Sequence, residues 1–195
     1  RLVIIEDGAW VSVASLGKED AGDIFLQAET LQLDNGFINA ETASTRGGDI
    51  TLNVSEKLVL RNGSQISTTA GTAEAGGDGG NIDINSKFII AIPNENSDIS
   101  ANAFTGSGGK VNITSQGIFG IESRSQPTDK SDITASSRRG ISGETNINQD
   151  DTSSIQNSFT EISPNIDTDA IIANSCIVRG NKKQENSFRN TGSGG

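Results

Sequence analysis

A short pattern of glycine followed by alternating polar and apolar residues recurs five times along this chain. Its clearest copy, residues 79–85, reads Gly-Gly-Asn-Ile-Asp-Ile-Asn. Because successive side chains of a β-strand point to opposite faces, this alternation places the apolar residues on a single face. Each copy therefore predicts a short strand with one buried face, entered through a glycine corner. The copies begin at Gly22, Gly47, Gly79, Gly108 and Gly143.

The copies form one repeat with a variable length. Counted between their last glycines, successive copies lie 26, 32, 29 and 34 residues apart. Self-similarity with a period of about 20–50 residues is the signature of solenoids, propellers and arrays. The extra residues fall in ranges 70–79, 93–97 and 122–131. Insertions confined to particular corners are tolerated by a solenoid, because loops there touch no neighbouring strand.

Two further apolar segments follow the first strand of each repeat. In the repeat that begins at Gly79 they cover residues 88–92 and 98–101. Three short strands with turns between them describe one coil of a parallel β-helix, in which each strand pairs with its equivalent about 4.8 Å above and below. The sequence therefore predicts an all-β fold, a parallel β-helix of about five to six coils. An antiparallel sandwich of hairpins is the alternative, but the ordered triplets of strands favour the β-helix.

The alternation also predicts which side chains fill the interior. Equivalent residues stack from coil to coil into aliphatic columns, and burial of each such side chain contributes roughly 1.5–3 kcal/mol. A single coil cannot bury its apolar face alone, so stability depends on stacking. The predicted inward residues are Ile24, Leu26, Leu31, Leu33, Ile50, Leu52, Leu58, Leu60, Ile66, Ile82, Ile84, Ile90, Ile99, Val111, Ile113, Ile121 and Ile133.

The repeats decay after Ile147, which divides the chain into two predicted parts. Residues 1–148 hold the β-helix repeats. Residues 149–195 begin with a polar stretch that is either a linker or a loose cover over the last coil. Residues 167–173 predict a short helix with an acidic N-terminus, which would cap the exposed strand edges of the stack. The tail beyond Gly180 is basic and polar, and it is predicted to be flexible.

Charge and composition exclude several functions. The net charge is −10, and phosphate binding needs a basic surface, so nucleic acid is excluded as a partner. A single cysteine excludes an internal disulfide framework. No apolar run approaches the roughly 18–20 residues of a membrane span, and no signal peptide is visible. Because the chain starts at Arg1 rather than Met, we expect a fragment or a processed product, with any export signal upstream.

Asp98 and Asp132 are the strongest candidates for chemistry, because they hold equivalent places before the third strand of successive repeats. Acidic residues on one face of a β-helix can bind calcium or cleave sugars. In the other interpretation each Asp caps backbone groups of a turn, beside Ser97 and Ser131. The turn is favoured, because sugar-binding subsites need aromatic residues and the chain has one Trp, seven Phe and no Tyr.

Other features are weaker as sites. Residues 76–83 resemble the calcium-binding glycine nonapeptide, but the pattern occurs once and has Asn81 and Asp83 at the wrong positions; it also lacks the Gly-Lys-Ser/Thr of a phosphate loop. Cys176 has no His to act as its base, since the chain contains none, and is expected to be a small buried residue. Trp10 either faces outward or packs in the core or an interface, and packing is favoured. We therefore predict no catalytic residue, no cofactor-binding residue and no metal ligand.

Three central motifs resemble a known protein family. They are residues 91–99 (Ala-Ile-Pro-Asn-Glu-Asn-Ser-Asp-Ile), 117–121 (Gly-Ile-Phe-Gly-Ile) and 131–137 (Ser-Asp-Ile-Thr-Ala-Ser-Ser). Together they resemble the C-terminal β-helix region of filamentous haemagglutinin-like exoproteins of the two-partner secretion type. The resemblance covers about residues 22–148. It implies a stalk in the form of a right-handed parallel β-helix.

The resemblance also implies partners and a location. Such proteins carry an upstream secretion domain and cross the outer membrane through a partner transporter barrel. The implied function is that of a non-enzymatic adhesin, secreted or displayed at the cell surface, whose stalk meets a glycan or another cell-surface ligand. A β-helix polysaccharide lyase or glycosidase is the alternative. A C-terminal export or anchoring module is a third option.

Overall fold

The computed structural model describes residues 1–149 of the chain. The predicted linker, helical cap, flexible tail and Cys176 lie outside the described residues. Residues 1–149 contain no helix, and so none long and apolar enough to span a membrane. The strands are β1 (Leu2–Glu6), β2 (Trp10–Ser12), β3 (Ile24–Asp34), β4 (Phe37–Asn39), β5 (Ile50–Arg61), β6 (Gln65–Ser67), β7 (Ile82–Ile90), β8 (Asp98–Ser100), β9 (Lys110–Ser115), β10 (Gly117–Phe119), β11 (Glu122–Ser123), β12 (Asp132–Thr134) and β13 (Glu144–Gln149).

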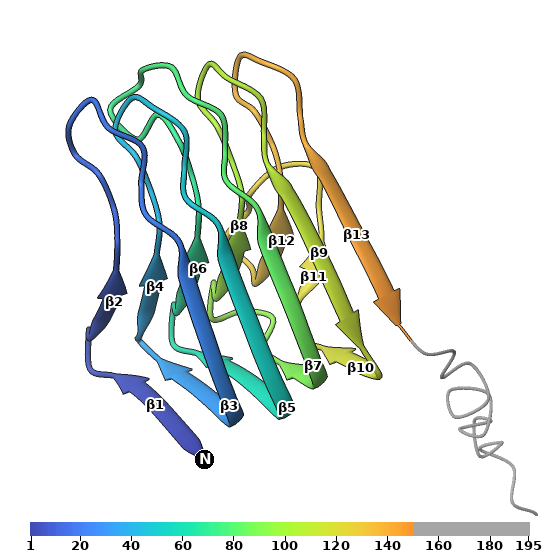
Figure 1. The fold of residues 1–195 in the computed structure, drawn as a ribbon. Coiled ribbons are helices and arrows are strands. Elements are labelled where there is room, and N and C mark those ends of the chain that lie inside the picture. The colour runs from blue at the N-terminus through green and yellow to red at the C-terminus, as the bar shows by residue number, and fades with distance from the viewer. Residues whose placement is uncertain (150–195) are drawn as a thin grey trace, which may run out of the picture. The chain divides into compact units, whose positions relative to one another are not determined.

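The strands stack into two parallel sheets, and Figure 1 shows one sheet lying behind the other. The larger sheet has the order β1, β3, β5, β7, β9, β13, with β10 paired to β7, and the smaller has the order β2, β4, β6, β8, β12, β11. The predicted fold class is therefore confirmed as a parallel β-solenoid. It has about four complete turns rather than five to six. The difference arises because the first level lacks its glycine-initiated strand and the last level is described only for that strand.

Aliphatic columns run along the stack, as the alternation predicts. Ile24, Ile50, Ile82 and Val111 pair in register on four neighbouring strands, and all four are buried. All but two of the predicted inward residues are buried in the same way. One exception is Leu26, which is partly buried and packs against the core cluster. The interior of the solenoid is thus closed by side chains of equivalent residues from successive turns.

The first and second predicted segments of a repeat form one continuous strand in β3, β5 and β7. The register of β5 with β7 shifts between Val54 and Lys57, where β5 carries one extra residue. A prediction that counts the same number of residues along β7 as along β5 therefore places the inward residue one position too late. For this reason the prediction that Ile90 faces the core is wrong. Ile89 pairs with Leu58 and is fully buried, whereas Ile90 is only partly buried.

The glycine corners stack so closely that no side chain fits. A Cβ placed on Gly80 would lie 2.0 Å from the carbonyl oxygen of Gly48, one turn away. Gly109 has the same relation to Gly80, at 1.9 Å. Because the obstacle is backbone, it cannot move aside as a flexible side chain could. The repeated glycine is therefore required by the approach of successive turns, and it fixes where each new turn begins.

Trp10 faces outward, so of the two favoured kinds of packing the one in the core is wrong, and packing at an interface stays a prediction. Its side chain is 65% exposed and lies over Phe37, with ring centroids 5.4 Å apart. The next residue, Val11, pairs with the fully buried Ile38 and takes the inward position. Since side chains alternate along a strand, Trp10 must then point to the outer face.

Candidate functional site

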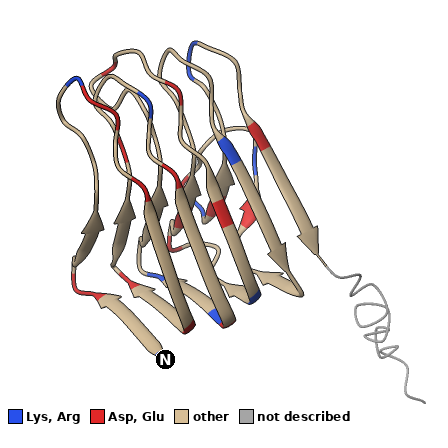
Figure 2. Cartoon of the chain, viewed as in Figure 1, with Lys and Arg blue, Asp and Glu red and all other residues tan. Residues whose placement is uncertain are grey.

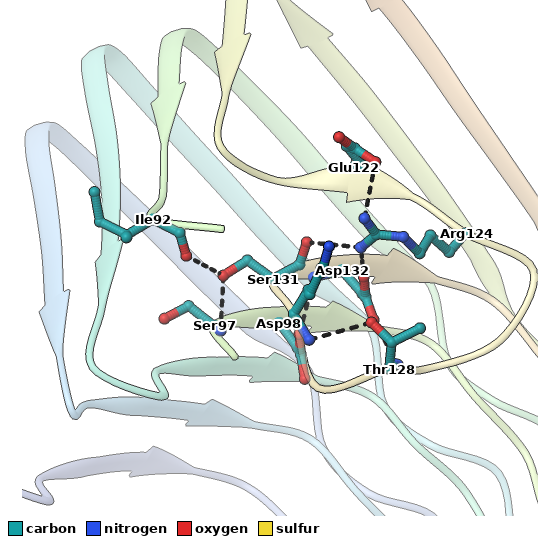
Figure 3. Close-up of polar contacts among 9 residues, drawn as sticks. Ile92, Ser97, Asp98, Glu122, Arg124, Thr128, Ser131 and Asp132 are labelled. Carbon is teal, nitrogen blue, oxygen red and sulfur yellow. Dashed lines mark hydrogen bonds and ion pairs between the residues drawn. The ribbon is translucent and has the colours of Figure 1, made fainter. Parts of the chain in front are cut away.

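The two candidate carboxylates lie side by side on neighbouring strands of the smaller sheet (Figure 3). Asp98 begins β8 and Asp132 begins β12. The backbone N–H of Asp132 donates a hydrogen bond to Oδ1 of Asp98 over 2.9 Å. The structure thus brings together the two residues that the sequence pairs by their place in the repeat.

Asp132 is a buried carboxylate, only 1% exposed. Its Oδ1 pairs with the guanidinium of Arg124, and its Oδ2 accepts hydrogen bonds from the backbone N–H of Thr128 (2.6 Å) and its hydroxyl (2.7 Å). A buried carboxylate is strongly destabilising unless a cation and hydrogen bonds compensate it, and both are provided here. The hydrogen bond to Asp132 also raises the pKa of Arg124, so the guanidinium stays charged.

Asp98 is in a different electrostatic situation. Removal from water raises the pKa of its carboxyl to about 6, the proximity of the Asp132 charge adds to the rise, and the hydrogen bond from the Asp132 backbone opposes it. An exposed aspartate titrates near a pKa of about 3.9. Asp98 can therefore take up a proton close to neutral pH, whereas Asp132 is held by a cation.

The local hydrogen bonds of Asp132 fit the turn interpretation, whereas Asp98 accepts a backbone N–H from the next turn rather than from its own. The hydroxyl of Ser131 donates to the carbonyl of Ile92 over 2.7 Å and accepts the backbone N–H of Ser97 over 3.0 Å. Together with the bonds from Thr128 to Asp132, these contacts fasten residues 124–131 to the turn below. Side chains of this kind are the usual partners of backbone groups in turns.

The Arg124–Asp132 pair holds an edge strand in place. β11 pairs in parallel with β12 on the side away from β8, so it lies at the level of β13 although it precedes β12 in the chain. The backbone N–H groups of Glu122 and Arg124 donate to the carbonyls of Ser131 (3.3 Å) and Ile133 (3.0 Å). An unpaired strand edge is prone to pairing with other chains. β11 covers the edge of β12, and the ion pair fastens it there.

Sequence reasoning missed both Arg124 and β11. Residues 122–131 looked like an insertion at a corner, and the arginine in it had no repeat equivalent to compare with. The usable signal was a lone arginine eight residues before the candidate Asp132, in a loop long enough to fold back. That signal is weak, because many loops contain an isolated arginine.

The chemical capacity of the pair is limited by these bonds. Among residues 1–149, no group of three His, Cys, Asp or Glu side chains is arranged to hold a metal ion. Asp132 could act as a nucleophile or base only after giving up Arg124 and Thr128. Asp98, with its raised pKa, is the member of the pair that could exchange a proton.

Comparisons with known proteins give no match: no protein-family model, no curated protein and no solved structure matches this chain. Function is therefore inferred from the residues, from their geometry and from the resemblance of the three central motifs.

Proposed function

We propose that this chain is part of the β-helical stalk of a non-enzymatic adhesin or exoprotein, secreted or displayed at the cell surface. The observation that carries the proposal is the uninterrupted stacking of like on like along both sheets. The glycine corners and aliphatic columns repeat at every described turn, and ladder hydrogen bonds join each turn to the next. Such a stack is a stiff body whose outward residues can vary without cost to the core.

The environment of Asp132 supports a role without catalysis. The best candidate nucleophile is buried and bound by Arg124 and Thr128, and these bonds fasten an edge strand. Residues placed in this way contribute to stability rather than to substrate contact. In the proposed function, chemistry is absent and the outward surface of the turns supplies the contacts.

The resemblance to filamentous haemagglutinin-like exoproteins supports the proposed location and partners. By that resemblance, the natural partners are an upstream secretion domain and a transporter barrel in the outer membrane. The ligand would be a glycan or another molecule of a cell surface. The chain itself would then act at a distance from the membrane, as a spacer that presents its outer face.

Two measurements on the source cells test this proposal. Fractionation with detection of this segment is expected to place it outside the cell, joined to further repeats that mass spectrometry can sequence. Beads coated with the purified chain are expected to adhere to glycan-bearing surfaces more than beads coated with albumin. A free chain confined to the cytoplasm, with no excess adhesion, would contradict the proposal.

A β-helix polysaccharide lyase or glycosidase is the second candidate. One observation favours it: Asp98 has a raised pKa and lies next to a second carboxylate, as the acid of a sugar-cleaving pair often does. Against it, neither Asp98 nor Asp132 lines the groove of about 700 Å³ on the larger sheet. The two functions differ in their products, since only the enzyme creates new chain ends in a polysaccharide.

A further inference from the structure

A groove of about 700 Å³ runs across the bends of four stacked strands, β3, β5, β7 and β9. It is separate from the Asp98–Asp132 pair, which lies on the smaller sheet. Its walls come from equivalent places of successive turns, so the groove follows the stacking direction. Its lining includes the polar residues Gln27, Asn53, Asn85 and Thr114 and the charged residues Arg1, Glu29 and Lys87.

One wall of the groove is a ladder of carboxamide and hydroxyl groups. Gln27 pairs in register with Asn53, Asn53 with Asn85, and Asn85 with Thr114. Register-matched residues on neighbouring strands repeat at about 4.8 Å. The groove therefore presents a hydrogen-bonding group at each turn, at a constant spacing and on one line.

These groups make no hydrogen bonds to other side chains or to backbone within residues 1–149. The row two residues earlier behaves differently on β7, β9 and β13. There, Asn112 donates to Asp83 over 2.8 Å and Asn146 donates to Asn112 over 3.2 Å. These three side chains thus bond to one another along the stack, whereas Asn53 and Asn85 in the groove keep their donors and acceptors for water or a ligand.

The charges of the groove favour a neutral ligand. Its lining holds one carboxylate, Glu29, and two cations, Arg1 and Lys87. Glu29 pairs with the N-terminal amine of Arg1, and Lys87 pairs with Glu56 at 3.7 Å. Figure 2 shows acidic and basic residues interspersed over the solenoid. The whole chain carries a net charge of −10, which repels polyanions. A charged polymer of either sign therefore gains little binding energy from electrostatic attraction in this groove, and a polar uncharged polymer meets no electrostatic repulsion.

The spacing selects the kind of polymer. In an extended peptide, side chains on one face repeat at about 6.6–6.8 Å, twice the rise per residue, which does not match a ladder of about 4.8 Å. A pyranose unit in an extended glycan is close to one ladder step in length and carries hydroxyls that both donate and accept. Phe25 lies two residues before Gln27 on the same face of β3 and is 69% exposed, so it offers an apolar surface for a sugar ring beside the ladder.

We propose that this groove binds a neutral, extended oligosaccharide along the solenoid, with the ladder from Gln27 to Thr114 pairing with successive sugar units. The proposal deepens the proposed adhesive function, on which it rests, by naming the ligand class and the surface that takes it. Binding would require no rearrangement of the turns, because the ladder is fixed by the strand register.

The test is a titration of the full 195-residue chain with oligosaccharides, in which NMR and calorimetry detect the binding. The probes are cellohexaose, hexagalacturonate as a charged counterpart, and an extended uncharged peptide of similar length. Cellohexaose is expected to bind saturably and to shift the resonances of Asn53 and Asn85. Asn53→Ala and Asn85→Ala are each expected to weaken binding about threefold to tenfold, the range for loss of one neutral hydrogen bond. Asn112→Ala removes the same kind of side chain from a position outside the groove lining, where it bonds to Asp83 and Asn146, and is expected to leave binding unchanged.

The outcomes separate this proposal from the adhesive function. If adhesion is unchanged in both Asn53→Ala and Asn85→Ala, the groove is not the ligand site, although the adhesive function still holds. The same follows if hexagalacturonate or the peptide binds more tightly than cellohexaose. Absence of saturable cellohexaose binding at millimolar concentration would also overturn it. A wild-type chain that shows no binding and no adhesion to glycan-bearing surfaces would overturn both.

Discussion

The central turns and the C-terminal level of the solenoid are held together by different forces. In the central turns, columns such as Ile50 over Ile82 are fully buried, and backbone packs on backbone at the glycine corners. At the C-terminal level, the smaller sheet is closed by β11, a strand of only two residues. An ion pair between the partly exposed Arg124 and the buried Asp132 fastens that strand.

The difference teaches where each kind of residue matters. Apolar columns give each central turn stability from both neighbours, so the outward residues there are free to vary. Within residues 1–149, the last level has a neighbour on one side only, and specific polar contacts stand there in place of a further apolar column. Changes to the core should therefore act globally, and changes to the ion pair should act locally.

The largest effect is expected from Ile82→Asp. Ile82 is 0% exposed between Ile50 and Val111, and a carboxylate there would be buried without a cation. We expect the free energy of unfolding to fall by more than about 4 kcal/mol, enough to unfold the central turns. Thermal melting by circular dichroism measures this. Asp83→Lys, at the exposed neighbouring position, is the control and is expected to change it by less than about 0.5 kcal/mol. Equal melting temperatures for the two variants would contradict the register.

A smaller global effect is expected from Gly80→Ala. The added Cβ would meet the carbonyl oxygen of Gly48 at 2.0 Å, so the two turns must separate locally. Overpacking of this kind costs about 3 kcal/mol. Urea unfolding followed by fluorescence of the single Trp gives the value. Gly17→Ala is the matched control, because its Cβ would meet no atom within 4 Å. If Gly80→Ala were as stable as Gly17→Ala, the glycine corner would not limit the stacking.

A local effect is expected from Arg124→Ala. It leaves the buried carboxylate of Asp132 without its cation, at a cost of about 2 kcal/mol. Because β11 depends on this pair, the amides of Glu122 and Arg124 should lose protection while those of β5 keep it. Hydrogen exchange by NMR resolves the two regions. Lys130→Ala, an exposed change in the same loop, should leave all of these amides protected. Loss of protection in both β11 and β5 of Arg124→Ala would show that the Arg124–Asp132 ion pair stabilises more than β11.

The smallest effect is expected from Asp98→Asn, and it depends on pH. In the folded chain Asp98 has a pKa of about 6, above its value in the unfolded chain. The folded state therefore binds the proton more tightly, and wild-type stability is lost as the pH rises from about 4 to about 6. Asparagine cannot ionise, so the variant should gain stability relative to wild type over that window and remain at least as stable at pH 7. Melting temperatures of both proteins at a series of pH values measure the gap. A gap that does not change with pH would contradict the assigned environment of Asp98.

The sequence predicted the solenoid well because its strongest constraints are periodic. The alternation at every second residue and the recurring glycine together determine which residues stack into the aliphatic columns. Ile24, Ile50 and Ile82 lie where this pattern predicts. The errors have local causes. Because β5 has one extra residue, counting by analogy with it predicted Ile90 rather than Ile89 in the core. No periodic signal marks a bulge in a single turn.

The candidate site was predictable only in part. Equivalent positions in successive repeats placed Asp98 beside Asp132, because register carries over from the repeat. Their partners could not be predicted in this way. Arg124 and Thr128 belong to an insertion that occurs once, and its fold-back onto β12 depends on tertiary contacts rather than on local pattern. The opposite electrostatic environments of the two carboxylates follow from those contacts.

The most direct test of display without catalysis is an assay for new polysaccharide ends. Wild type and Asp98→Asn would be incubated with a panel of acidic and neutral polysaccharides, and reducing and unsaturated ends would be counted. Asp98→Asn is the informative variant, because it is expected to remain folded while losing the Asp98 carboxyl, whose pKa is raised to about 6. We predict no new ends above a protein-free blank with either protein. New ends produced by wild type and abolished in Asp98→Asn would contradict the proposal and identify the pair as catalytic.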